Sequence, residues 1–302
     1  MGLVISKRSG LVVILSALAG SPAAKAGLQS WDLIEAVEGR ATRDLPLPLI
    51  QSLLNGAPGT SVSLVVRRNR RAEEPQDVKL TRAAVVPSAV ASKMLADKIG
   101  YLDVDALPNG RAADVARALR ELESQGAQRL ILDLRNNALG DPLEGIRLAN
   151  LFVDDGLLAY LQGQKFARKD FPAEARQAVS KLPLVVLTNR TTAGAAELAA
   201  AAILDRKRGQ VVGERTFGIA ATQKTIPMED GAAIILSTAK YYRPSGRAIQ
   251  DGGVNPTLQV LESDSPADED PTQPPAPKPP DKDEVLEKAI EVVKGAALPA
   301  AA

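Results

Sequence analysis

Apolar and polar residues follow two different patterns along the chain. In residues 61–67 (SVSLVVR) they alternate, which places three apolar side chains on one face and predicts a strand with one buried side. Residues 129–135 (RLILDLR) and 182–187 (LPLVVL) are continuous apolar runs, typical of strands covered on both faces of a sheet. These runs lie in residues 85–262, where predicted strands and helices alternate, so we expect an α/β domain with a central sheet covered by helices.

Helical spacing appears between the predicted strands. Residues 47–56 (LPLIQSLLNG) and 110–126 (GRAADVARALRELESQG) carry apolar residues three or four positions apart, and each segment ends in a glycine. A further helix is predicted from about 194 to 205. Residues 99–107 (IGYLDVDAL) are predicted to form one strand.

The first 28 residues permit two interpretations. Residues 2–5 (GLVI) and 11–16 (LVVILS) have the pattern of strands separated by a polar turn, and Pro22 can open a short helix that Gly27 ends. An early Lys-Arg pair, an apolar run and small residues are also features of a secretory signal, although this run is too short to span a bilayer. Because the signal is not clear, we expect these residues to belong to a folded domain.

The chain changes character near its end. Residues 263–282 (SDSPADEDPTQPPAPKPPDK) are rich in proline and acidic residues, which predicts a solvated, extended linker. Residues 283–302 follow as a helix and tail, and residues 284–295 have an apolar side made of Leu286, Ala289, Ile290 and Val293.

Composition excludes several kinds of chemistry. The 302 residues suffice for about two domains. A net charge of +1 and 3% aromatic residues argue against a nucleic-acid partner. The sequence has no cysteine and no histidine, which removes thiolate sites, histidine-dependent catalytic systems and the commonest metal ligand. We therefore expect no metal and no cofactor, and acid–base chemistry near neutral pH must use Lys, Asp, Glu or Tyr.

One segment has the layout of a nucleophile-bearing turn without a nucleophile. Residues 182–187 lead through small residues into an alanine-rich helix, the arrangement in which many hydrolases hold a reactive serine. At the turn itself, residues 193–196 (AGAA) offer no hydroxyl group.

The N-terminal part resembles a PDZ domain over about residues 1–84. GSPAAKAGL (20–28) followed by DLI matches the helix-then-strand core of PDZ domains in bacterial processing proteases, except that Trp31 stands where the family usually has glycine. The resemblance implies that the backbone N–H groups of a loop formed by Gly2, Leu3, Val4 and Ile5 bind a peptide C-terminus, and that the peptide adds as a strand. The alternative is that these four residues are simply a buried first strand. A beginning at this loop also suggests that an N-terminal segment is missing.

Taken in order, several blocks resemble the carboxyl-terminal processing proteases, peptidase family S41. They are GYLDVDAL, LILDLRNN, the turn from Asn189 to Glu197, VVGERTFG and DGAAIILSTAKYYRPSGRAIQDGGVNPT. The resemblance implies a ClpP/crotonase-like core, residues 85–262, whose central sheet is covered by helices, following the PDZ domain. It also implies activity outside the cytoplasm, in the periplasm, cell envelope or thylakoid lumen.

The family's Ser-Lys dyad falls on residues without reactive groups. The family serine lies three residues before a Glu that corresponds to Glu197, so its position is Gly194. The family lysine lies 25 residues further, at Ile219, and the Gln that orients it corresponds to Gln223. Glycine has no oxygen with which to attack a carbonyl group, and isoleucine accepts no proton. The conserved spacing excludes a local insertion that displaces the pair.

The oxyanion region is altered as well. The resemblance assigns it to Gly140 and Ala195, but Leu139 interrupts the family's glycine-rich turn after residues 136–137. A displaced pair of Thr191 or Thr192 with Lys224 is an alternative source of activity. The competing interpretation makes Thr192 a helix cap and Lys224 a solvated strand residue.

The remaining polar residues of these blocks receive structural roles. Glu197 and Asp205 are expected to serve as helix and salt-bridge residues. Tyr241 and Tyr242 are expected to pack around the cleft, where one of them could line a peptide groove.

Three functions remain open at this point. The first is a pseudoprotease that holds protein C-termini, or an active protease or adaptor partner, through the PDZ domain and an inactive cleft. The second is an active serine-type endopeptidase with displaced groups. The third is a structural subunit of a homo-oligomer, in which the C-terminal helix docks onto a neighbour.

Overall fold

The protein is described by a computed structural model, which covers residues 1–68, 74–228, 233–261 and 282–296. The chain divides into two compact units. One contains Met1–Ser88, and the other contains Ala89–Ser263 together with the C-terminal helix. All but one residue of the predicted linker, 263–282, lies outside the described part of the chain.

The first unit is an antiparallel sheet with two helices. Its strand order is β1-β2-β3-β5-β6, with β4 paired to β3. The elements are β1 (Leu3–Arg8), β2 (Leu11–Ala17), α1 (Pro22–Lys25), β3 (Leu33–Val37), β4 (Arg40–Ala41), α2 (Leu47–Leu54), β5 (Ser61–Arg67) and β6 (Gln76–Thr81). The alternation predicted for residues 61–67 is confirmed, because Val62, Leu64 and Val66 are buried in the core of this unit.

The N-terminal residues are part of this fold. The apolar run of β2 is buried and paired with β1 on one side and β3 on the other. β1 continues through Lys7 and Arg8, where the sequence predicts a polar turn, and the chain reverses at Ser9 and Gly10 with φ of +50° and +81°. Ser21 caps α1 by accepting the N–H of Ala24 at 3.2 Å.

The second unit is built on a mostly parallel sheet, which is the central sheet predicted for residues 85–262. Its strand order is β18-β15-β14-β10-β8-β7, and only β7 runs antiparallel to its neighbour. The strands are β7 (Ala91–Leu95), β8 (Ile99–Asp103), β10 (Arg129–Asp133), β14 (Leu184–Thr188), β15 (Gln210–Gly213) and β18 (Leu258–Gln259).

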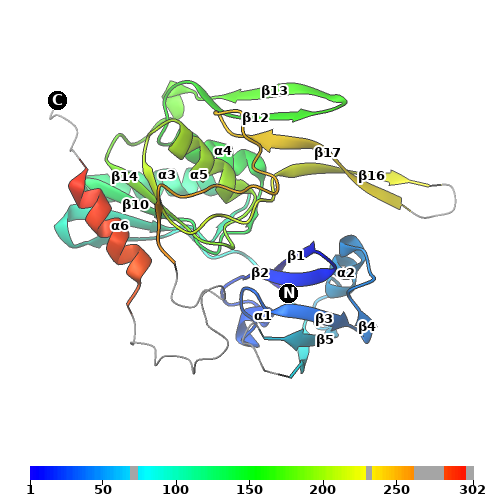
Figure 1. Ribbon diagram of the computed structural model, residues 1–302. Coiled ribbons are helices and arrows are strands. Elements are labelled where there is room, and N and C mark those ends of the chain that lie inside the picture. Colours follow the sequence, from blue (N-terminus) through cyan, green and yellow to red (C-terminus); the bar gives the residue numbers. More distant parts are fainter. Residues whose placement is uncertain (69–73, 229–232, 262–281, 297–302) are drawn as a thin grey trace, which may run out of the picture. The chain divides into compact units, whose positions relative to one another are not determined.

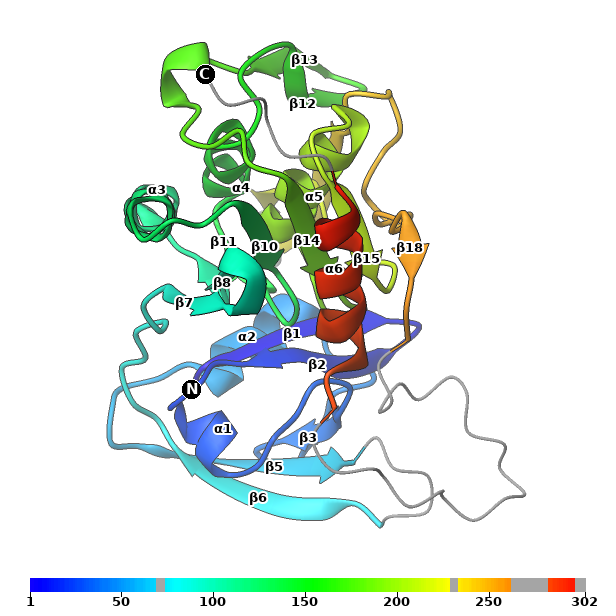
Figure 2. The same cartoon turned by 90° about the vertical axis from the view of Figure 1, so that its left-hand side faces the viewer.

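Helices cover both faces of this sheet (Figures 1 and 2). Leu130 and Leu132 of β10 pack in the core cluster that includes α3 (Arg111–Ser124), α4 (Pro142–Asn150) and α5 (Ala195–Asp205). Ile131, between them, packs on the opposite face in the cluster of α6 (Glu284–Gly295). Burial on both sides explains why β10 lacks polar alternation.

One predicted strand is wrong in extent. Residues 99–107 form two strands, because the chain leaves the sheet after Asp103. The N–H of Val104 donates to the carbonyl of Asp133 at 3.1 Å, and β9 (Ala106–Leu107) then pairs in parallel with β11 (Leu139–Gly140) in a separate ladder.

A second sheet of this unit has the order β13-β12-β17-β16. Its strands are β12 (Leu157–Gly163), β13 (Phe166–Pro172), β16 (Ala221–Pro227) and β17 (Ala233–Tyr242). Ala239 and Tyr241 of β17 are buried in a core that also contains residues of α4 and α5. Single 3₁₀ turns occur at Ala96–Lys98 and Ala175–Gln177.

The C-terminal helix packs within its own unit. α6 has the predicted bounds, and Val285, Ala289 and Val293 are buried against strands of the parallel sheet. Asp283 precedes it and binds Arg135 through two oxygens, at 2.9 and 2.7 Å. The apolar side of α6, which the structural-subunit hypothesis places against a neighbour, is therefore covered by the chain itself. No helix among the described residues combines the length and the apolar character needed to cross a membrane.

Candidate active site

The predicted nucleophile turn lies at the carboxyl end of β14, where the chain enters α5. Gly194 is the N-cap residue of α5, with φ of +63° and ψ of −117°. Only glycine adopts such a backbone without strain. A Cβ atom at this position would meet only the carbonyl oxygen of Ile219, at 3.9 Å. The turn thus retains space for a side chain but carries the one residue that has none.

A pair of asparagines holds this turn to the one that follows β10. The Asn189 side-chain oxygen accepts the N–H groups of Asn136, Thr191 and Thr192 at 3.0, 3.3 and 3.1 Å. In return, Nδ2 of Asn189 donates to Oδ1 of Asn136 at 2.9 Å. Ala193 N–H donates to the carbonyl of Asn137 at 2.9 Å. These bonds fix the backbone on which Gly194 sits.

Glu197 joins Gly194 and Ile219, the two positions at which the resemblance places the serine and the lysine. Its Oε2 accepts the N–H of Gly194 at 3.0 Å and the N–H of Ile219 at 2.8 Å. Its Oε1 accepts the N–H of Gly218 at 2.7 Å and the hydroxyl of Thr216. The side chain is fully buried. The sequence predicts a helix and salt-bridge residue here, but these partners of the carboxylate are N–H and hydroxyl donors and not cations.

The surroundings of Glu197 raise the pKa of its carboxyl group. Burial raises the pKa of the Glu197 carboxyl to about 7, because the charged form loses its hydration, and the four donated hydrogen bonds only partly oppose this effect. The group therefore titrates near neutral pH, at the junction of the Gly194 and Ile219 segments.

The Ile219 segment offers no base. Ile219 is half-buried, and its backbone N–H is bound by Glu197. Gln223, which the resemblance assigns to orienting a lysine, lies on β16 and is exposed. A different glutamine, Gln250, contacts the segment, since its Oε1 accepts the N–H of Ala220 at 2.9 Å. The sequence analysis did not single out Gln250 or Thr216. The only signal for them was that both lie in segments that resemble the protease family.

The residues assigned to the oxyanion region lie together. A Cβ atom on Gly140 would come within 3.0 Å of the Ala195 Cβ and 2.6 Å of the Leu107 Cβ. Gly140 therefore packs directly against the first residue of α5, where any larger residue would collide. Leu139 and Gly140 form β11 and are tied to β9, so this backbone is held in a ladder and not in a free turn.

The threonines beside Gly194 are committed to structural hydrogen bonds. The Thr191 hydroxyl donates to Asn136 Oδ1 at 2.9 Å, and the Thr192 hydroxyl donates to the carbonyl of Leu134 at 2.8 Å. Both residues are buried, whereas Lys224 is exposed on β16. The prediction that Thr192 caps the helix is wrong, because Gly194 occupies the cap position.

Asp205 and the two tyrosines have structural surroundings. Asp205, at the end of α5, pairs with the Arg243 guanidinium, which holds its carboxyl pKa below the usual value against the effect of burial. Tyr241 is buried in the core, and Tyr242 stacks on Tyr160 with ring centres 4.8 Å apart.

The residues assigned to peptide binding lie at an open sheet edge in the first unit. Gly2 has φ of +78°, and a Cβ there would collide with the Ser21 Cβ at 2.2 Å. Leu3, Val4 and Ile5 begin β1, the outermost strand of its sheet. Ile5 is buried, while Leu3 and Val4 are half-buried. Trp31, where the PDZ resemblance implied glycine, has φ of +73°.

The arrangement around Gly194 limits the available chemistry. It presents backbone N–H groups, a buried carboxyl and committed hydroxyls, but no free nucleophile or neutral amine at the two dyad positions. Among the described residues, no group of three or more Asp or Glu side chains is placed to hold a metal ion.

Comparison with known proteins places these features in context. The profile of peptidase family S41 matches residues 98–260, and that of the PDZ domain matches residues 13–68. A carboxyl-terminal-processing protease of Synechocystis sp. is 35% identical over 275 residues, covering 87% of this chain and 64% of the relative. The carboxy-terminal processing protease CtpA of Bacillus subtilis is 32% identical, covering 86% and 55%. The chain thus spans less than two thirds of the length of these relatives.

A solved structure gives the same result. The photosystem II D1 C-terminal processing protease superposes with a TM-score of 0.78 at 32% identity, covering 86% of this chain and 72% of that protein.

Proposed function

Because the chain belongs to peptidase family S41 and carries a PDZ domain, we propose that it is a non-cleaving member of the family that captures unstructured protein C-termini. One observation carries the proposal. Gly194 and Ile219 are joined through Glu197 in an ordered site that has neither a hydroxyl to attack a peptide bond nor an amine to receive its proton.

The altered oxyanion region supports the same conclusion. When one member of a catalytic triad is lost, about 10³–10⁴-fold acceleration over water remains, and that remainder depends on the oxyanion hole and on binding. Here both dyad groups are absent and Leu139 interrupts the glycine-rich turn. Cleavage at a useful rate is therefore not expected from this site.

The first unit supplies the capturing surface. β1 is an outermost strand of its sheet, and Leu3 of β1 packs against the core of the unit, as Leu47 and Leu53 of α2 also do. A peptide that adds to β1 gains main-chain hydrogen bonds and sets alternate side chains beside these residues. Its terminal carboxylate would meet the backbone N–H groups of residues 2–5.

Fluorescence polarisation tests the capture. We expect peptides with a free C-terminal carboxylate to bind at least about tenfold more tightly than the same peptides with a C-terminal amide, because each charge-assisted hydrogen bond is about twice as strong as a neutral one. Equal affinity of both forms, or no binding of either, would remove PDZ capture from the proposal.

The active-protease alternative is less well supported. It requires a threonine hydroxyl beside a lysine amine, but Thr191 and Thr192 donate their hydroxyls to Asn136 and Leu134. The structural-subunit alternative loses its main argument, since α6 is buried on its own sheet.

The cellular setting follows from the family alone. The two relatives named above are bacterial carboxyl-terminal processing proteases. A further relative is a chloroplastic C-terminal processing peptidase. We accordingly propose an extracytoplasmic location and, as partners, protein C-termini or an active protease or adaptor. Fractionation of cells that produce the full-length protein tests the location.

A further inference from the structure

The outer half of the β16–β17 hairpin carries exposed apolar side chains. Ile226, Ile234 and Leu236 are 39%, 42% and 47% exposed. Ile226 lies opposite Ile234, and Lys224 lies opposite Leu236. Because directly opposite residues of an antiparallel pair share a face, and residues two apart in one strand share it too, these three side chains form one surface. We call this surface the hairpin patch.

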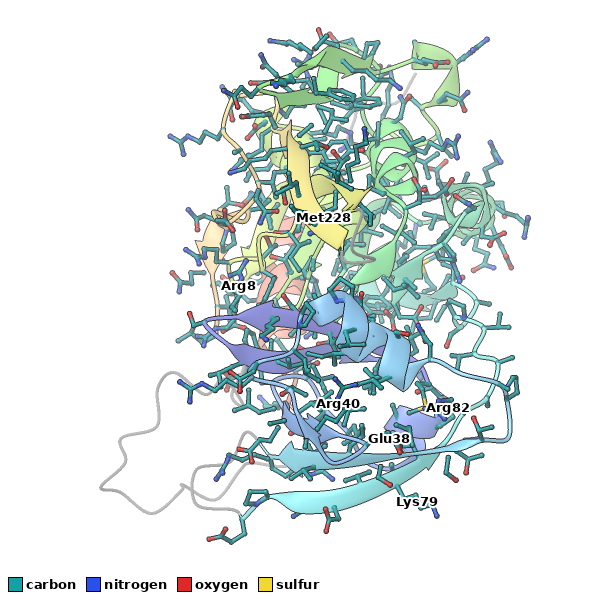
Figure 3. All side chains as sticks on the ribbon, turned by 90° about the vertical axis from the view of Figure 1, so that its right-hand side faces the viewer. Arg8, Glu38, Arg40, Lys79, Arg82 and Met228 are labelled. Atoms are coloured by element: carbon teal, nitrogen blue, oxygen red, sulfur yellow. The ribbon has the colours of Figure 1, made fainter. Side chains whose placement is uncertain are left out.

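The hairpin patch continues the side of the sheet that is buried nearer the core. Thr222 lies opposite Ala239, which is buried against α4 and α5. The pairing register shifts between Thr222 and Gln223, where β17 has one extra residue. β16 has no extra residue, so Lys224 and Ile226 follow Thr222 at intervals of two and project from the same side of that strand. Figure 1 shows the hairpin extending past both helices, and Met228, labelled in Figure 3, lies just beyond the end of β16. The side that helices cover in the inner half is thus bare in the outer half.

β16 is also an outermost strand of its sheet. The outer strands β13 and β6 carry several charged side chains, among them Arg168 and Lys169, and Asp77 and Lys79. Such charges discourage pairing with another chain. β16 carries a single charged residue, Lys224, as β7 carries Lys93, and the hairpin patch lies beside the open main-chain edge of β16.

We propose that an extended polypeptide adds to the free edge of β16 as a further strand, with apolar side chains at alternate positions resting on the hairpin patch. The inference rests on the proposed function and describes the path along which the bound polypeptide reaches the inactive site. A strand that follows β16 from Ile226 back to Ala221 runs roughly 17 Å. It ends two residues from Ile219, which Glu197 holds beside Gly194.

The continuity of β16 with this site favours a polypeptide over a second copy of the chain. Association with a second copy would explain the exposed hairpin patch, but it would not explain why the edge of β16 leads to Gly194. The main-chain edge recognises any extended segment, and the hairpin patch selects for apolar residues two apart.

The test uses the full chain and a fluorescein-labelled, C-terminally amidated 15-residue peptide with apolar residues at alternate positions. The amide removes the carboxylate on which capture at residues 2–5 depends, so its polarisation reports binding elsewhere. We expect the Ile226→Glu/Leu236→Glu variant to bind this peptide at least about tenfold more weakly, because two apolar contacts are lost. Phe166→Glu on β13, an equally exposed apolar residue, is the matched control and should leave the affinity unchanged.

Hydrogen exchange locates the bound strand. The amides of residues 222–226 should exchange more slowly when the peptide is present. Unchanged affinity in the double variant, provided that its circular dichroism matches that of the wild type, overturns the inference. So does protection confined to β1, or an amidated peptide that fails to bind.

The outcomes separate this inference from the proposed function. If only peptides with a free carboxylate bind, and they protect β1, capture stands and the β16 strand does not. If the wild type sediments as a dimer, the double variant as a monomer, and neither binds the peptide, the hairpin patch is a self-association surface and the inference is wrong.

Discussion

Gly194 and Ile219, 25 residues apart in the sequence, donate their backbone N–H groups to the same oxygen of Glu197, at 3.0 and 2.8 Å. The two positions at which the family resemblance places the nucleophile and its base are therefore joined through one carboxylate. This relationship makes the site testable by substitution.

Purified wild-type protein should leave β-casein intact. The double variant Gly194→Ser/Ile219→Lys restores a hydroxyl and an amine at positions that Glu197 holds together, and we expect it to cleave casein slowly. Electrophoresis of a digestion series provides the measurement. Thr191→Ala and Thr192→Ala serve as controls for any wild-type cleavage. Activity that either of them abolishes would refute the assignment of an inactive site.

Substitution of Gly194 should cost stability without a steric collision. Gly194→Ala and Gly194→Ser should each lower the free energy of unfolding by about 1–3 kcal/mol, because φ is +63° and the added Cβ meets only one atom, at 3.9 Å. Urea unfolding compares both variants with Gly145→Ala. There the Cβ would lie 2.0 Å from the Ala195 carbonyl oxygen, so a larger loss is expected. If Gly194→Ala lowered the free energy of unfolding as much as Gly145→Ala does, position 194 would not have the space for a Cβ atom that the structure shows.

The stability of the protein should depend on pH through Glu197. Its pKa is raised by burial from 4.5 to about 7, so the folded state binds the proton more tightly than the unfolded state does. This contribution to stability is complete below pH 4.5 and is lost as the pH rises to about 7. It amounts to roughly 3 kcal/mol at most.

The comparison variant for this pH dependence is Glu197→Gln. The variant should be less stable than the wild type at low pH, because its amide group places an N–H donor against the N–H donors that surround residue 197. Its free energy of unfolding should not show the fall between pH 4.5 and about 7 that Glu197 causes. Urea titrations from pH 4 to 8 measure the difference between the two proteins. Parallel curves would show that Glu197 does not titrate in this range.

Asp283 should anchor the C-terminal helix. Its carboxylate binds Arg135 and also accepts the N–H of Leu286 at 2.9 Å as the cap of α6. Asp283→Ala should lower the free energy of unfolding by about 1 kcal/mol, a modest value because the side chain is partly exposed. Glu291→Ala, on the exposed side of the same helix, should change it little. Equal effects of the two substitutions on thermal unfolding would argue against an anchoring role.

The hydrophobic pattern by itself determined the elements of this protein to a large extent. The continuous runs of β10 and β14 required a sheet buried on both faces, and the alternation of β5 required one buried side. The bounds of α6 followed from its apolar spacing. The residue types at 194 and 219 also came from sequence alone, since their spacing from Glu197 matches the family pattern.

Other features depended on contacts between distant segments. The break after Asp103 arises because Val104 finds its acceptor on β10, which local propensity cannot reveal. The role of Glu197 came from four donors between 194 and 219, and its raised pKa from complete burial. The docking of α6 on its own sheet and the bare hairpin patch were likewise decided only by the tertiary structure. Burial and hydrogen-bond partners depend on the whole fold, whereas periodicity is a property of each segment.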